Sequence, residues 1–244
     1  MKPSLRRSGL WTIVYLALFM LAQYGAYSFL VYETMQRRAC SSQKAASIVL
    51  HSQQPIFYAL AVLIGLLVFY LLIWLRRIRW WDMILLKPIK SSRLLIYFSI
   101  GVLLNILFYL IMLSLNAIPQ LAAWRQSAGS SSPALFAAGV NARELFCVIL
   151  SLGILVPIYE EIVFRGLIFR ELAAAVPLHW AWLLQAAVFT LYHRQLLSIP
   201  LYFMLALVLG SSYLKEKTIL SPWAVHCGFN ISGYFIQAYV AGFM

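Results

Sequence analysis

The stretch Val148–Gly166, which reads VILSLGILVPIYEEIVFRG, decides the fold class. It is apolar enough to lie in a membrane, yet it carries two adjacent glutamates, Glu160 and Glu161, and one arginine, Arg165. A charged side chain at membrane depth costs about 2.5–3.5 kcal/mol on insertion scales. Such groups are kept where they are paired, hydrated or used, so ionisable residues in this stretch indicate a functional site.

The rest of the chain shares this apolar character. Its 244 residues are 63% hydrophobic and 11% charged, whereas a soluble domain has roughly 45–50% apolar and about 25% charged residues. Because the apolar residues form long runs, the sequence predicts an all-α, polytopic transmembrane helical bundle with a polar intramembrane cavity. We expect a single integral membrane domain, with N-terminal transmembrane helices over residues 1–130 and the site-bearing core over residues 131–244.

The apolar runs predict about seven to eight spans. A spanning helix needs about 20 apolar residues, and the candidates are residues 10–32, 56–75, 95–116, 144–163, 179–193, 199–214 and 219–241. The segment 132–143 is expected to add a partial or interfacial helix. The fifth candidate is short and prolines interrupt the second half, so we expect broken or tilted helices there.

Basic residues predict the orientation of the bundle, because they gather in cytoplasmic loops. With the N-terminus inside, 13 of the 19 lysines and arginines fall in cytoplasmic segments. These are Lys2, Arg6, Arg7, Arg76, Arg77, Arg79, Lys87, Lys90, Arg93, Arg165, Arg170, Lys215 and Lys217. The N-terminus is therefore predicted to be cytoplasmic. The net charge of +12 is explained by such loops and by membrane lipid, and we expect no nucleic-acid partner.

The two glutamates are predicted to do different work. In a helix, adjacent side chains point about 100° apart, while Glu161 and Arg165, four residues apart, share a face and can form an ion pair. Glu160 then has no partner on its own helix. An apolar pocket disfavours the charged form of a carboxyl group, which suits a general base that works near neutral pH. The alternative is that both acids only cap a helix end at the membrane interface.

Two further pairs of residues, each with at least one polar side chain, lie in later apolar segments. Phe189 and His193 are four residues apart and share a helix face, as do His226 and Asn230. The His226 imidazole and the Asn230 amide can both donate hydrogen bonds to a developing oxyanion. Gly228 lies between these two residues and permits close approach of the backbone. The alternatives are a structural histidine at a helix end and polar side chains that only bridge helices.

Counting along the predicted spans exposes a conflict. Glu160 falls near the inner end of the fourth span, and His193 falls near the outer end of the fifth. A shared site needs the two side chains within about 3 Å, or one water apart. Either the fifth span is tilted and re-entrant, or the true boundaries differ by several residues.

The motifs E-E-x-x-x-R, F-x-x-x-H and H-x-x-x-N, in this order, resemble those of the CPBP family, the CAAX proteases and bacteriocin-processing enzymes also called the Abi family, which includes the type II CAAX prenyl protease. The resemblance covers about residues 144–234. It implies an intramembrane endopeptidase that cleaves a peptide or membrane-protein substrate. By this resemblance Glu160 and His193 activate a water, His226 and Asn230 stabilise the oxyanion, and the remaining motif residues brace the site. Those bracing residues are Glu161, Arg165 and Phe189.

The same residues are also compatible with other mechanisms and functions. The resemblance favours a glutamic-type mechanism without a cofactor, but Glu160, His193 and His226 could alternatively hold zinc. The same fold could be non-catalytic, as in bacteriocin self-immunity or in binding of a regulatory partner, and a transporter could use these residues as a proton relay. Because family members of this size are common in bacteria, we expect a bacterial plasma membrane.

Overall fold

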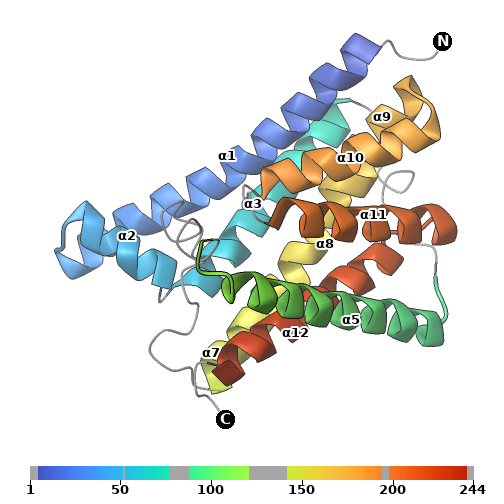
Figure 1. Ribbon diagram of the computed structural model, residues 1–244. Coiled ribbons are helices and arrows are strands. Elements are labelled where there is room, and N and C mark those ends of the chain that lie inside the picture. The colour runs from blue at the N-terminus through green and yellow to red at the C-terminus, as the bar shows by residue number, and fades with distance from the viewer. Residues whose placement is uncertain (1–4, 52, 77–87, 121–141, 194–197, 241–244) are drawn as a thin grey trace.

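The helical bundle is seen in a computed structural model that describes residues 5–51, 53–76, 88–120, 142–193 and 198–240. The regular elements assigned in these residues are all helical, which confirms the all-α prediction (Figure 1). They are α1 (Leu5–Arg38), α2 (Ser42–His51), α3 (Gln54–Leu75), α5 (Ser91–Asn116), α7 (Ala142–Val148), η1 (Ile149–Leu155), α8 (Val156–Glu161), η2 (Ile162–Ile168), α9 (Phe169–Ala175), α10 (Leu178–Tyr192), α11 (Ile199–Glu216) and α12 (Leu220–Val240).

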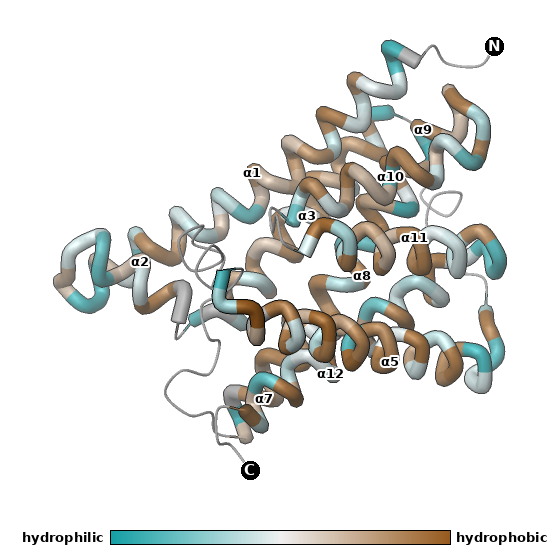
Figure 2. The backbone as a smooth tube through the Cα atoms, viewed as in Figure 1, coloured by the Kyte–Doolittle hydropathy of each residue, from teal (hydrophilic) through white to brown (hydrophobic). Residues whose placement is uncertain are grey.

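Each of the seven predicted spans corresponds to a helix. Among the described residues, four helices are long and apolar enough to cross a membrane by length and composition alone: Arg6–Arg38, Pro55–Leu75, Ser91–Leu115 and Leu145–Ala175. Figure 2 shows hydrophobic residues along most of α1, α3 and α5 and hydrophilic residues mostly toward the ends of these three helices. The partial helix predicted at 132–143 lies, up to residue 141, outside the described residues. So does the predicted domain boundary at 130, which stays a prediction.

The fourth span is longer than predicted. Instead of ending at residue 163, the helix continues through α7, η1, α8, η2 and α9 from Ala142 to Ala175. Two stretches of it, η1 and η2, are π-helical, with hydrogen bonds from Val156 N–H to the Ser151 carbonyl and from Phe169 N–H to the Phe164 carbonyl. Such wide turns are frequent at functional sites. The two glutamates therefore lie near the middle of this helix and not at its end.

A tight turn then sends the chain back along the same helix. Val176 is extended and Pro177 is the N-cap of α10, which runs antiparallel to α9 (Figure 1). Glu160 precedes Ala175 by 15 residues and His193 follows Leu178 by 15 residues. At 1.5 Å per residue, both lie roughly 22 Å from the turn. The conflict in depth was thus an error in the fourth boundary, and the short α10 needs no re-entrant path.

Helices α5 and α12 cross at very close range, and glycine allows it. A Cβ atom added to Gly228 would overlap the backbone of Phe98 in α5, and one added to Gly101 would overlap the backbone of Val225 in α12. This confirms the close approach predicted at Gly228. The crossing holds the helix that carries His226 and Asn230 firmly against α5 (Figure 1).

The N-terminal helices pack directly on the site-bearing helix. Helix α1 lies against α3, η2 and α9. Phe19 of α1, fully buried, stacks its ring 4.9 Å from that of Tyr159, and Gly65 of α3 leaves the space that the Tyr159 ring fills. At one end of these helices, Arg76 forms an ion pair with Glu171 at 2.7 Å.

One residue counted for the orientation does not belong in a loop. Arg165 is fully buried, so its charge serves the interior of the bundle and not the topology. The start of α1 and the ends of α3 and α11 lie on one side of the bundle (Figure 1), as the orientation requires. Lys2, Arg77, Arg79 and Lys87 fall outside the described residues.

Candidate active site

A buried ion pair joins Glu161 to Arg165. The Arg165 Nη1 atom lies 3.0 Å from Glu161 Oε1, and both side chains have no exposed surface. The other guanidinium nitrogen, Nη2, donates to the Ala206 carbonyl of α11 at 3.4 Å, and the guanidinium lies 4.9 Å from the centre of the Phe189 ring. The ion pair predicted from the spacing is therefore present, and it ties the fourth span to α10 and α11.

His226 of α12 lies between the two glutamates. Its Nδ1 is 2.9 Å from Glu161 Oε1, and its Nε2 is 3.6 Å from Glu160 Oε2. Because Glu161 Oε1 also accepts a hydrogen bond from Arg165, the bond at Nδ1 is assigned from the imidazole to the carboxylate. Nε2 and the Glu160 carboxyl group then face one another.

His193 is held by its own helix. Its Nδ1 donates to the Phe189 carbonyl at 2.8 Å, since a carbonyl can only accept. The neutral imidazole therefore keeps Nε2 as an acceptor. Tyr202 of α11 stacks on the ring at 4.5 Å. Backbone and stacking together fix both the tautomer and the orientation of this histidine.

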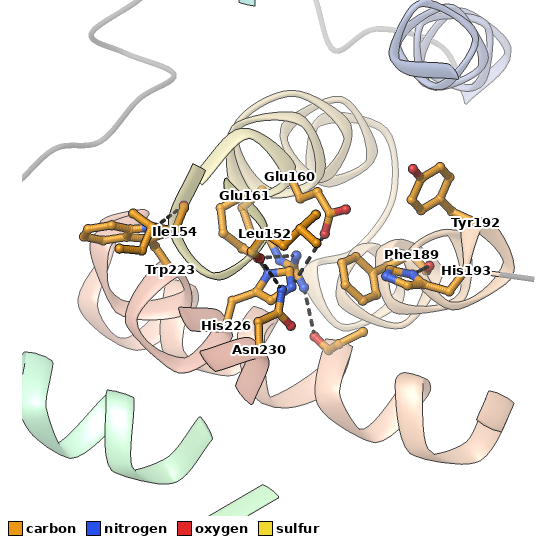
Figure 3. A network of polar contacts seen from close by, with 12 residues as sticks. Leu152, Ile154, Glu160, Glu161, Phe189, Tyr192, His193, Trp223, His226 and Asn230 are labelled. Carbon is orange, nitrogen blue, oxygen red and sulfur yellow. Dashed lines mark hydrogen bonds and ion pairs between the residues drawn. The ribbon is translucent and has the colours of Figure 1, made fainter. Parts of the chain in front are cut away.

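Phe189 separates the two imidazoles. Its ring centre is 4.5 Å from that of His193 and 5.9 Å from that of His226. Figure 3 shows Glu160 and His226 on one side of this ring and His193 on the other. The structure gives no direct hydrogen bond between Glu160 and His193, so joint action on a water requires that water to lie between them.

Asn230 has a second task that the sequence did not predict. Its Nδ2 donates to the Leu152 carbonyl at 2.9 Å. The N–H of Val156, the usual helical donor, bonds to Ser151 instead, and Pro157 has no N–H to offer. Asn230 therefore satisfies a carbonyl that the π-helical turn and the proline leave free, and one N–H of its amide remains for a ligand.

The described residues do not offer a metal site. No three His, Cys, Asp or Glu side chains among them are grouped so that they could hold a metal ion. Phe189 lies between the two imidazoles. The zinc alternative through Glu160, His193 and His226 does not fit this arrangement.

Five tyrosines around Glu160 were not singled out from the sequence. Their hydroxyls are within electrostatic reach of the Glu160 carboxylate, and they come from five different helices. They are Tyr58, Tyr159, Tyr192, Tyr202 and Tyr234. In apolar spans a tyrosine resembles any other large hydrophobic residue, and only the fold shows which of them lie near one carboxylate.

The comparisons with known proteins agree with the motifs. Residues 142–232 match the family described as Type II CAAX prenyl endopeptidase Rce1-like. The match begins at the first residue of α7, ends within α12 and contains all seven predicted site residues. Comparisons with curated proteins and with solved structures give no match. Over residues 142–232, the chain is therefore similar to the Rce1-like type II CAAX prenyl endopeptidases.

Proposed function

We propose that the protein is an intramembrane endopeptidase that cleaves a peptide or membrane-protein substrate with a water activated by Glu160 and His193. The observation that carries this proposal is the placement of Glu160. Its Oε2 lies 3.6 Å from His226 Nε2, while its neighbour Glu161 is already paired with Arg165. A buried carboxyl group that no cation of its own helix neutralises is suited to accept a proton.

The attack would proceed through a tetrahedral intermediate. The Glu160 carboxylate takes one proton of the water while His193 Nε2 accepts a hydrogen bond from its other hydrogen. The water oxygen bonds to the substrate carbonyl carbon, whose oxygen becomes an oxyanion. Glu160 then returns the proton to the leaving amide nitrogen as the carbon–nitrogen bond breaks.

The oxyanion would be stabilised by His226 and by the free N–H of Asn230. To donate from Nε2 while Nδ1 donates to Glu161, His226 must be the imidazolium. The Glu161 carboxylate, 2.9 Å from Nδ1, stabilises that charge, and Arg165 holds Glu161 in place through the ion pair. The pair thus supports catalysis through His226, at a position where a preorganised donor contributes about 10²–10³ in rate.

The experiment that tests this function also distinguishes between two classes of substrate. We test the purified protein in liposomes with a prenylated C-terminal CAAX peptide and with the same peptide unprenylated, which represents a bacterial peptide precursor. Glu160→Gln is expected to abolish cleavage of whichever peptide is cut, and its unfolding temperature should match that of the parent. Unchanged cleavage would refute the assignment of the base. Failure of the parent to cut either peptide would favour the non-catalytic alternative, a self-immunity or regulatory membrane protein.

We further propose that the N-terminus faces the cytoplasm of a bacterial cell. The basic ends of α1, α3 and α11 support this, because positive residues remain on the cytoplasmic side. An enzymatic reporter that is active only in the periplasm, fused before residue 1, should be silent. Periplasmic activity of that fusion would reverse the orientation.

A further inference from the structure

The hydroxyl of Tyr192 is polar, sits beside the proposed base and is used by none of the steps above. Tyr192 is the last residue of α10 and directly precedes His193. Its ring packs edge-on against Phe19 of α1 at 4.9 Å, and Phe164 and His193 lie 5.9 Å and 5.3 Å away. With aromatic rings around it, the Tyr192 ring is fixed in one orientation.

A glutamine of α1 holds this hydroxyl. Gln23 Nε2 donates to Tyr192 Oη at 2.5 Å. Because the phenol oxygen accepts this bond, its own hydrogen remains free to be donated to a third group. Gln23 lies in the middle of an apolar span, where an amide without a partner would be costly. The bond therefore satisfies Gln23 and at the same time sets the direction of the Tyr192 O–H.

The Glu160 carboxylate lies on this side of the ring. Figure 3 shows the Tyr192 hydroxyl on the side of the ring that faces Glu160. The other four tyrosines around Glu160 have no side-chain hydrogen bond recorded in the described residues, and the Tyr159 hydroxyl is buried without a partner. Tyr192 is thus the one whose hydroxyl is aimed by a neighbour.

The groups that face Glu160 come from every helix packed around it. Glu161 and Arg165 act from its own helix and His226 from α12. The tyrosines act from α3, α8, α10, α11 and α12. Among the described residues, Tyr192 is the only one of the five whose hydroxyl accepts a hydrogen bond from a side chain outside residues 142–232.

We infer that Tyr192 is a positioning residue for Glu160 and that Gln23 of α1 aims its hydroxyl, so that the O–H donates to the Glu160 carboxylate directly or through one water. The inference rests on the proposed function, since it assigns Tyr192 to the base of that reaction. It makes α1, which precedes the matched residues 142–232, a part of the working site and more than a packing helix.

A double-mutant cycle on turnover tests this assignment with the full-length protein in liposomes. Tyr192→Phe should lower kcat about 10- to 100-fold with little change in KM, as expected for one hydrogen bond to a charged group. Gln23→Leu should lower kcat by a similar factor in the parent but by less than about twofold in the Y192F background. Tyr24→Phe, which removes an exposed hydroxyl next to Gln23, is the matched control and should leave kcat unchanged.

Equal losses from Gln23→Leu in both backgrounds would overturn the inference, because they would show that Gln23 only packs α1. An infrared titration of the Glu160 carboxyl band, identified by its loss in E160Q, gives a readout that does not depend on cleavage. Tyr192→Phe should move the midpoint of this titration to higher pH, because the ionised carboxylate loses a donor. If the parent cleaves no peptide, the proposed function fails, and an unmoved midpoint then overturns the inference separately.

Discussion

Replacement of Arg165 by methionine tests the buried ion pair most directly. Methionine keeps most of the length of the side chain and removes its charge. Arg165 and Glu161 are both fully buried, 3.0 Å apart, and removal of one partner of such a pair costs about 3–5 kcal/mol of folding stability. His226 Nδ1 still donates to the same Glu161 oxygen at 2.9 Å. We therefore expect the lower end of this range, about 3 kcal/mol.

The assay is the free energy of unfolding in mixed micelles, followed by tryptophan fluorescence during titration with a denaturing detergent. Arg170→Met is the matched control, because Arg170 is exposed and only five residues further along the same helix. It should change the unfolding free energy by no more than about 0.5 kcal/mol. Glu161→Gln added to Arg165→Met should recover part of the loss, since it removes the stranded charge. Equal stability of the R165M and R170M variants would refute the buried pair.

Three further results are expected. Asn230→Ala should lower turnover about 10²–10³-fold and lower the free energy of unfolding by about 1–3 kcal/mol. In a Pro157→Ala background, which restores a backbone N–H beside the Leu152 carbonyl, only the loss of turnover should persist. An equal loss of stability in that background would contradict the role assigned to the hydrogen bond from Asn230 to Leu152. Gly228→Ala should lower the free energy of unfolding by about 1–3 kcal/mol, because it overpacks the α5–α12 crossing. Gly25 has open space around it, so Gly25→Ala should be neutral or slightly stabilising, and similar values for the two variants would contradict the close crossing. Cleavage should survive treatment with a zinc chelator, and loss of activity that added zinc restores would replace the mechanism proposed here.

The sequence predicted what depends on spacing within one helix. Each of the seven apolar runs corresponds to a helix, and the interval of four residues paired Glu161 with Arg165. Gly228 marked a close approach of backbones that the structure has. These features follow from the 3.6-residue period and from residue size, which are readable without knowledge of any neighbouring helix.

What depends on partners from other helices was not predictable. The fourth span was ended too early because charge at Glu160, Glu161 and Arg165 looks like a membrane boundary, whereas the pairing of those charges lets the helix continue. The bond from Asn230 to the Leu152 carbonyl exists only because α12 passes that point. Gln23 and Tyr192 lie in separate apolar spans, and the sequence of neither span predicts their hydrogen bond.

The two helical arms that meet at the α9–α10 turn are equally long, with 15 residues from Glu160 to Ala175 and 15 from Leu178 to His193. The length of these arms sets the distance of the proposed site from the turn. One residue inserted into α10 would rotate His193 by about 100° and shift it by about 1.5 Å, which would disable the protein whatever residue was added. About seven residues added to both arms, two turns each, would keep Glu160 opposite His193 yet carry the pair roughly 10 Å further from the turn. Chimeras with longer or shorter arms should therefore cut the same tethered substrate at different distances from the membrane surface.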